Sequence, residues 1–150
     1  MCIYTLNMGL IKTNETFMVT YGDGLSNVNF KKLKRFHFKK KKIATLTAVR
    51  PPARFGEIFF KKNNIVKSFK EKQQISTGWI NGGFILFKFE IFQYLRKNEM
   101  LERRPMQRLV KSNNLAAYKH NGFWQCMDTM RDKTNLENLI KKSKVLPWMK

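Results

Sequence analysis

The run Ile43–Val49 constrains the fold of this chain more than any other segment, because it is almost continuously apolar and has the length of one strand. Strands of this kind are usually buried on both faces, as in the parallel sheets of α/β proteins. The Lys-rich segment 29–42 precedes it with apolar residues at helical spacing, and Phe17–Tyr21 is an earlier β-type run. This order predicts a βαβ unit with a right-handed crossover, and hence the α/β class.

The rest of the chain predicts short alternating elements. The runs Glu57–Phe60 and Ile65–Phe69 flank Lys62–Asn64 and indicate a hairpin. A turn at Gly78–Gly83 is expected to lead into a strand at Phe84–Phe87. The remaining predictions are a helix at Ile91–Arg96, a helix opened by Pro105 and reaching Val110, a strand at Leu115–Lys119, and a last helix ending at Lys142 with Met130, Leu136, Leu139 and Ile140 inward.

The 150 residues suit one domain, of which 1–14 is irregular, and no linker divides the chain. Cys2 and Cys126 are too few for a disulfide scaffold and fit a reducing compartment. The longest apolar stretch, near Phe84–Phe89, is interrupted by Lys88 and is too short to span a bilayer. The start of the chain has no secretory-signal pattern. We therefore expect a cytoplasmic protein with no membrane partner.

The strongly positive charge allows two interpretations. Lys and Arg number 30 against 10 Asp and Glu, for a net charge of +20, which would attract polyanions such as nucleic acid. The densest run, Lys39–Lys42, ends a segment that also fits an amphipathic helix with solvated lysines. The apolar face of that helix would carry Phe30, Leu33, Phe36 and His37. Because no zinc knuckle, RNP motif or helix-turn-helix pattern is present, we favour the solvated face over a nucleic-acid partner.

The motif Tyr21–Gly24 places Asp23 between two glycines just after a buried strand. In open α/β sheets, ligands bind beyond the carboxyl ends of the strands, and glycine lets a phosphate-bearing ligand approach the backbone. A carboxylate there could hold Mg²⁺ together with phosphate oxygens. An ordinary Asp-Gly turn explains the same residues, so both interpretations stay open at this point.

Two further spots could carry chemistry. Asp128 stands just before the last predicted helix and could be a second metal carboxylate, although Asp128 or Thr129 could equally be the N-cap. Glu71 and Lys72 end a predicted strand and could accept a sugar hydroxyl and clamp a phosphate, or could form a solvated charge cluster. Cys126 is interpreted as a small packed residue and not as a nucleophile.

Taken together and in order, these segments resemble glucose-1-phosphate cytidylyltransferases, a branch of the sugar-phosphate nucleotidyltransferases. The resemblance runs from about residue 15 to residue 150. It rests on the strings TFMVTYGDGLS (16–26), ATLTAVRPPARFGEI (44–58), FKEK (69–72), GWINGGF (78–84), AYKHNGFWQCMDTMRDK (117–133) and PW (147–148). The resemblance implies a Rossmann-like sheet with added β-hairpin structure.

The resemblance also implies an activity: CTP and glucose 1-phosphate give CDP-glucose and pyrophosphate, a supply route to dideoxysugars of surface polysaccharides such as O-antigen. It assigns Mg²⁺ to Asp23 and Asp128, which we expect within about 10 Å of each other because Mg²⁺–oxygen bonds are short. In the sugar subsite, Lys72 beside Glu71 would face the sugar phosphate. Further substrate-binding positions implied by the resemblance are Gly22, Gly56 and Asn81. A homo-oligomer is also implied.

The family's glycine-rich loop and the lysine of its PKP segment, which hold the CTP phosphates, have no counterpart in this sequence. We therefore expect a truncated nucleotidyltransferase domain that lacks the first strands and most of the nucleotide side, retains the sugar side, and has little activity alone. Two alternatives stay open: a non-catalytic basic module that binds polyanions, and a decayed reading frame.

Overall fold

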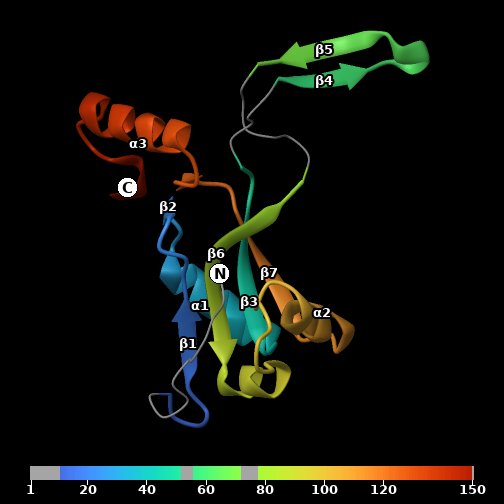
Figure 1. Cartoon of the computed structure of the whole chain (residues 1–150), viewed down its shortest axis with the longest axis vertical. Coiled ribbons are helices and arrows are strands. Elements are labelled where there is room, and N and C mark those ends of the chain that lie inside the picture. The colour runs from blue at the N-terminus through green and yellow to red at the C-terminus, as the bar shows by residue number, and fades with distance from the viewer. Residues whose placement is uncertain (1–10, 52–55, 72–77, 150) are drawn as a thin grey trace. The chain divides into compact units, whose positions relative to one another are not determined.

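The apolar run becomes strand β3 (Ala44–Val49), and five of its six residues are buried. The structure is a computed structural model that describes residues 11–51, 56–71 and 78–149. In it β3 belongs to a four-stranded sheet of order β1-β6-β3-β7, shown in Figure 1. Its other strands are β1 (Thr16–Val19), β6 (Ile80–Lys88) and β7 (Leu115–His120). Helices and this central sheet confirm the α/β class.

Strand β6 lies between the two strands of the predicted βαβ unit. It pairs antiparallel with β1, where Thr16 stands opposite Lys88. On its other side, the Lys88 N–H donates to the carbonyl of Ile43 at 2.8 Å, so β3 begins beside the end of β6. The crossover through α1 therefore joins β1 to β3, which are separated by β6 in the sheet. Its handedness stays a prediction.

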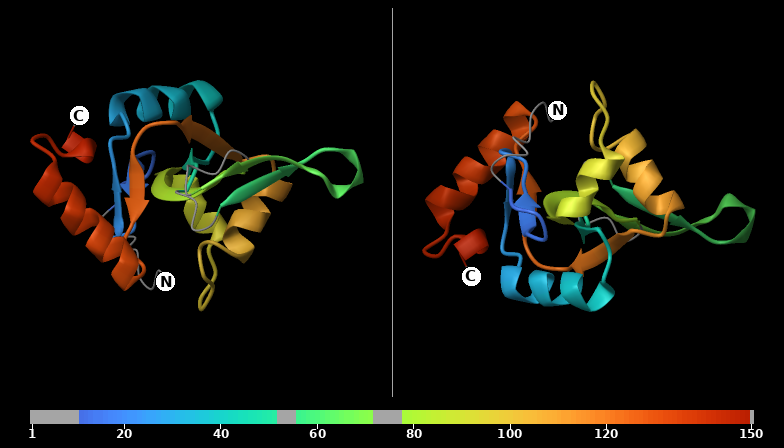
Figure 2. Two further views of the ribbon diagram at one scale, coloured as in Figure 1. Left: turned by 90° about the horizontal axis from the view of Figure 1, so that it is seen from above. Right: turned by 90° about the horizontal axis from the view of Figure 1, so that it is seen from below.

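Helix α1 (Phe30–Lys40) covers one face of the sheet, as Figure 2 shows. Asn29 caps it by accepting a hydrogen bond from the Lys32 N–H at 2.9 Å. Its buried residues, Leu33 and His37, are one turn apart and lie inward as predicted. Phe30, predicted for the same face, is 48% exposed, so that part of the prediction is wrong. His37 Nδ1 lies 2.8 Å from the Thr45 hydroxyl of β3, and this contact fixes the helix against the sheet.

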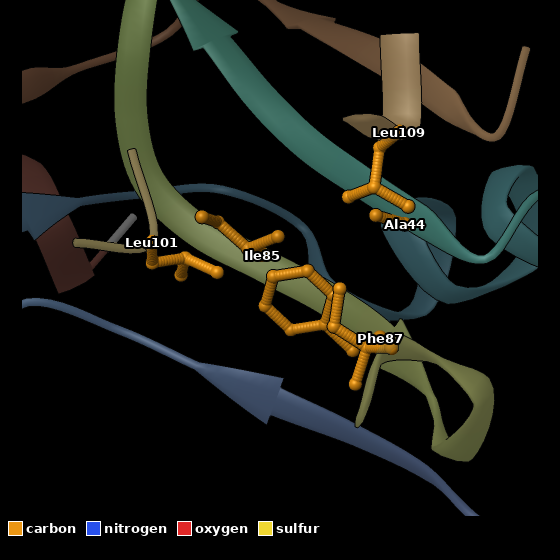
Figure 3. Packing of buried hydrophobic residues seen from close by; sticks show 6 residues of the cluster. Ala44, Ile85, Phe87, Leu101 and Leu109 are labelled. Carbon is orange, nitrogen blue, oxygen red and sulfur yellow. The ribbon is translucent and has the colours of Figure 1, made fainter. Parts of the chain in front are cut away.

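The hydrophobic core lies on the opposite face, under α2 (Arg104–Lys111) and the 3₁₀-helix η3 (Phe89–Tyr94). Figure 3 shows Ile85 and Phe87 of β6 beside Leu109 of α2. The buried cluster consists of Ala44, Ile85, Phe87, Ile91, Leu101 and Leu109. Ala44 of β3 faces the cluster and Thr45 contacts His37 of α1, which is why the strand is buried on both faces.

The described residues form two compact units. Unit 1 comprises Met1–Gly22, Asn29–Thr47 and Gly82–Lys119, so it holds the core and most of the sheet. Unit 2 comprises Asp23–Val28, Ala48–Asn81 and His120–Lys150. The elements of unit 2 include β2 (Gly24–Ser26), β4 (Glu57–Phe60), η2 (Lys62–Asn64), β5 (Val66–Lys70), β8 (Trp124–Cys126), α3 (Met130–Lys142) and η4 (Pro147–Met149). One domain over 1–150 stays a prediction.

Most predicted elements are confirmed, including the antiparallel hairpin β4–β5. Three further details are wrong. Gly82 and Gly83 lie inside β6 and not in a turn, and in place of the helix Ile91–Arg96 there is the 3₁₀-helix η3, which begins two residues earlier. On α3, Leu136 is buried as predicted, but Met130 and Ile140 are 73% and 53% exposed. No helix among the described residues combines the length and apolar character needed to cross a membrane.

Candidate active site

The pairing of β2 with β8 brings the two candidate metal carboxylates close along the backbone. The strands are antiparallel, with Gly24 opposite Cys126. The ladder continues one step further, because the Met127 N–H donates to the carbonyl of Asp23 at 2.9 Å. Asp128 is the residue after Met127, so it is adjacent in the chain to the partner of Asp23, and the separation of the two carboxylates stays a prediction. Residues far apart in the sequence thus meet at one end of a short ladder.

Polar contacts at the opposite end hold this ladder in register. The carbonyl of Phe123 accepts hydrogen bonds from the Ser26 hydroxyl at 2.8 Å and from the Asn27 N–H at 3.2 Å. His120 Nε2 lies 3.1 Å from the Asn27 side-chain oxygen. A Cβ at Gly122 would collide with both of these side chains, so glycine is required there for close packing.

The structure settles which residue caps α3. The Thr129 hydroxyl accepts a hydrogen bond from the Asp132 N–H at 3.2 Å, and the Asp132 carboxylate accepts one from the Thr129 N–H at 3.1 Å. This capping box makes Thr129 the N-cap, so the alternative in which Asp128 caps the helix is wrong. Asp128 is therefore exposed at the end of the ladder without a capping role.

The thiol beside this acidic end is kept protonated. Burial raises the pKa of Cys126 to about 11, and a hydrogen bond to Asp128 and the negative charges of Asp128 and Asp132 act in the same direction. A thiol at neutral pH is a poor nucleophile, since the thiolate is the reactive form. The interpretation of Cys126 as a packed residue fits this environment.

The carboxylates of Asp23 and Asp128 are of the chemical type that binds a hard cation, which could also bind substrate. Asp23 and Asp128 are both exposed, so their carboxylates are accessible to a ligand. Over residues 11–51, 56–71 and 78–149, no group of three or more His, Cys, Asp or Glu side chains could enclose a metal ion. An ion bound by both Asp23 and Asp128 would need further oxygens, and this combination is typical of Mg²⁺ with phosphates.

A second pair of candidate residues meets at the base of the β4–β5 hairpin. A Cβ at Gly56 would lie 2.5 Å from the Phe69 ring and 2.9 Å from the Glu71 carboxylate. The Phe69 ring and the Glu71 carboxylate thus lie where a side chain of residue 56 would begin, so the structure brings Gly56 and Glu71 together. Lys72, the other predicted residue of this subsite, lies outside the described residues.

The two remaining candidates occupy separate places. Gly22 follows β1, is exposed, and has open space where a side chain would be, which allows a ligand to reach the backbone. Asn81 is the second residue of β6 and is partly buried. The sequence analysis missed Arg50, whose guanidinium lies 4.9 Å from the centre of the Trp79 ring. In the sequence, Arg50 could have been noticed as a positively charged residue directly after the predicted strand Ile43–Val49.

Comparison with protein families gives a match between residues 2–141 and the model described as "Nucleotidyl transferase". Over 139 residues, the chain is 40% identical to glucose-1-phosphate cytidylyltransferase of Salmonella typhimurium, covering 92% of this chain and 53% of that protein. It is 27% identical over 127 residues to the catalytic subunit beta of mannose-1-phosphate guanylyltransferase of Drosophila melanogaster, covering 82% of this chain and 34% of that protein.

Among solved structures, HddC from Yersinia pseudotuberculosis matches with a TM-score of 0.57 and 19% identity, covering 85% of this chain and 56% of that one. At this identity the likeness concerns the fold alone. The chain spans about half the length of the curated relatives it matches.

Proposed function

Since the chain belongs to the nucleotidyl transferase family, we propose that it is a glucose-1-phosphate cytidylyltransferase or part of one. The reaction would convert CTP and α-D-glucose 1-phosphate into CDP-glucose and pyrophosphate. Identity of 40% to the Salmonella typhimurium cytidylyltransferase, against 27% to the guanylyltransferase subunit, favours this substrate pair.

The observation that supports the proposal is the β2–β8 ladder, whose last hydrogen bond joins Asp23 to Met127, the residue before Asp128. In the proposal these two carboxylates hold Mg²⁺, because this ion prefers one or two carboxylates supplemented by phosphate oxygens. When bound, Mg²⁺ would supply positive charge to neutralise the phosphate oxygens of CTP. Asp132 is bound to the α3 cap and to the Gln125 side chain, so it is assigned no part in this site.

The transfer itself needs no nucleophile from the protein. An oxygen of the sugar phosphate attacks the α-phosphorus of CTP in line, a new P–O bond forms, and the bond to the β-phosphate oxygen breaks as pyrophosphate leaves. The protonated Cys126 thiol does not compete with this attack. The contribution of the chain is to position the reactants and to stabilise charge.

The sugar side is assigned to the base of the hairpin. Glu71 would accept a hydrogen bond from a sugar hydroxyl, and Gly56 would contact the sugar through its backbone, beside the Glu71 carboxylate. Lys72 would face the sugar phosphate. Further contacts are assigned to Gly22 and Asn81.

We also propose that the 150-residue chain alone turns over little or no substrate. It spans about half the length of its relatives, and the glycine-rich loop expected to bind the CTP phosphates has no counterpart in its sequence. A cytoplasmic location, a homo-oligomer and a role in surface polysaccharide synthesis remain predictions of the same proposal.

The test is pyrophosphate release in a chimera that places residues 11–149 after the N-terminal half of the Salmonella typhimurium relative. With CTP, glucose 1-phosphate and Mg²⁺, the chimera should turn over, and the 150-residue chain alone should not. Asp23→Asn should lower kcat of the chimera by about 100-fold or more, because it removes charge at the reacting phosphates. Substantial turnover by the chain alone would refute the proposed inactivity.

Glu137→Gln is the matched control, because it also removes one carboxylate but lies on α3 beside Lys133. Its rate should stay within about twofold of the parent, as expected for an exposed ion pair. If Asp23→Asn and Glu137→Gln have equal rates, Asp23 is not in the site. If ATP or GTP with glucose 1-phosphate exceeds CTP, the assigned nucleotide is wrong.

A further inference from the structure

The charge of this chain is concentrated in two segments that lack carboxylates altogether. Residues 24–56 contain ten Lys and Arg, residues 103–127 contain five, and neither segment contains Asp or Glu. In unit 1 these segments supply α1 and β7. The sequence alone favoured lysines that are merely solvated, but the structure adds a feature that solvation does not explain.

That feature is an open pocket of about 590 Å³ between the end of α1 and β7. Its aromatic lining consists of Phe36 and Tyr118, whose ring centres lie 5.5 Å apart at 65°. Three lysines also line it, Lys40, Lys42 and Lys119, and no Asp or Glu is among its described lining residues. Rings and cations without a carboxylate are therefore gathered in one concave place.

The cations are placed directly against the rings. Lys40 Nζ lies 5.4 Å from the centre of Phe36, and on the exposed side of α1, Lys34 Nζ lies 5.9 Å from the centre of Phe38. The helix thus alternates aromatic rings with ammonium groups from its middle to its end. A ligand with flat rings linked by phosphates matches both components.

We propose that the α1–β7 pocket binds single-stranded nucleic acid, with bases against Phe36 and Tyr118 and phosphates against Lys40, Lys42 and Lys119. An acidic peptide would satisfy the lysines and leave the rings unused. A membrane surface would favour a convex apolar face, whereas these rings lie in a concavity. The binding requires neither Asp23 nor Asp128, so it is independent of the proposed nucleotidyl transfer.

The first experiment measures binding of a fluorescein-labelled oligothymidylate of about 20 nucleotides to the 150-residue chain by anisotropy, across a salt series. We expect binding that persists at about 150 mM salt. The double variant Lys40→Gln/Lys42→Gln should bind about tenfold more weakly and should lower the salt slope by about 1.4, since each phosphate contact on a single strand contributes about 0.7. Loss of all binding by wild type at that salt would overturn the proposal.

The matched control is Lys141→Gln/Lys142→Gln, which removes the same charge from the exposed last turn of α3. It should weaken binding less than twofold. Equal weakening by both pairs would mean attraction by net charge alone, which overturns the pocket assignment. Circular dichroism of both double variants checks that the helices are retained.

Tyr118→Leu separates stacking from charge. It should weaken oligothymidylate binding several-fold and leave binding of inorganic polyphosphate unchanged, because only the bases use the ring. Equal effects on both probes would overturn the stacking contact. If this variant does not fold, NMR titration of wild type with oligothymidylate replaces it: shifts should concentrate at residues 34–42 and 115–119, and shifts elsewhere would refute the site.

Discussion

The two units differ in what they do with large apolar side chains. In unit 1, Ile85, Phe87 and Leu109 are almost completely buried in one cluster. In unit 2, the register of the β4–β5 hairpin places Ile58 opposite Phe69, and Phe60 opposite Val66. These four side chains share one face of the hairpin and are each at least half exposed.

This difference indicates that the residues that stabilise the fold and the candidate functional residues lie mostly in different units. A buried cluster supplies the hydrophobic free energy that holds a sheet together, whereas a two-stranded hairpin alone is marginally stable. All but one of the candidate substrate and metal residues belong to unit 2, the exception being Gly22. The best-packed side chains thus lie in unit 1, whereas most residues of the proposed site lie in segments of unit 2 that are held by a few hydrogen bonds.

The strongest test of this contrast compares two phenylalanines. Phe87→Ala should lower the free energy of unfolding by about 3–5 kcal/mol, because it leaves a cavity at a residue that is 1% exposed. Phe60→Ala, at 60% exposure, should cost less than about 1 kcal/mol. Urea unfolding monitored by circular dichroism measures both. Similar losses would mean that the hairpin is as well packed as the core.

Two glycines provide the next comparison. Gly83 has φ +86°, and a Cβ there would lie 2.5 Å from the Tyr21 ring, so Gly83→Ala should cost about 2–3 kcal/mol. Gly22→Ala meets nothing within 4 Å and should change the free energy of unfolding by less than about 0.5 kcal/mol. Thermal unfolding measures both. If Gly83→Ala is harmless, the tight approach of Tyr21 to β6 is wrong.

His37 predicts a pH dependence for unit 1. Burial, and then the positive charge of Lys88, lower the pKa of His37 in the folded state. Below about pH 6.5, His37 takes up a proton more readily in the unfolded chain than in the folded chain. The contribution of neutral His37 to the free energy of unfolding is therefore fully present above pH 6.5 and is lost as the pH falls. Urea unfolding at pH 8 and pH 5.5 should show the loss, and His37→Gln should reduce it. If the His37→Gln variant loses as much free energy of unfolding between pH 8 and pH 5.5 as the parent chain, His37 is not the cause of the loss.

The smallest expected effect concerns the start of α3. Thr129→Ala should lower the free energy of unfolding by about 1 kcal/mol, because it removes the N-cap. Asp128→Asn should leave unfolding nearly unchanged while lowering turnover of the chimera. Calorimetry measures the stability of both variants, and the pyrophosphate assay measures the turnover of the chimera that carries each change. If Asp128→Asn is the more destabilising change, its role is structural.

Local sequence signals predicted the elements well where one physical cause dominated. The periodicity of 29–42 gave helix α1 with Leu33 and His37 inward, and the proline at position 105 marked the first turn of α2. Gly82 and Gly83 were predicted to belong to a turn, and that prediction is wrong. Both lie within strand β6, where Gly83 makes room for the Tyr21 ring. That requirement comes from a side chain distant in the sequence.

The candidate site shows the same division. The acidic residues were identified from their place after a strand and before a helix, and their roles stay predictions. The choice between Asp128 and Thr129 as cap was open, although Asp132 three residues after Thr129 already suggested a capping box. Pairing of β2 with β8 could not be predicted, since three-residue strands carry almost no periodicity.

The sequence by itself determined the α/β class, the inward positions of Leu33 and His37, the hairpin and the concentration of positive charge, because these follow from spacing and composition over a few residues. Only the tertiary structure decided that β6 lies between β1 and β3, that Asp23 and Asp128 end one ladder, and that Phe36 and Tyr118 share a pocket with lysines. Each of these depends on contacts between distant segments, which form only when the burial of the whole core outweighs the entropy of closing the chain.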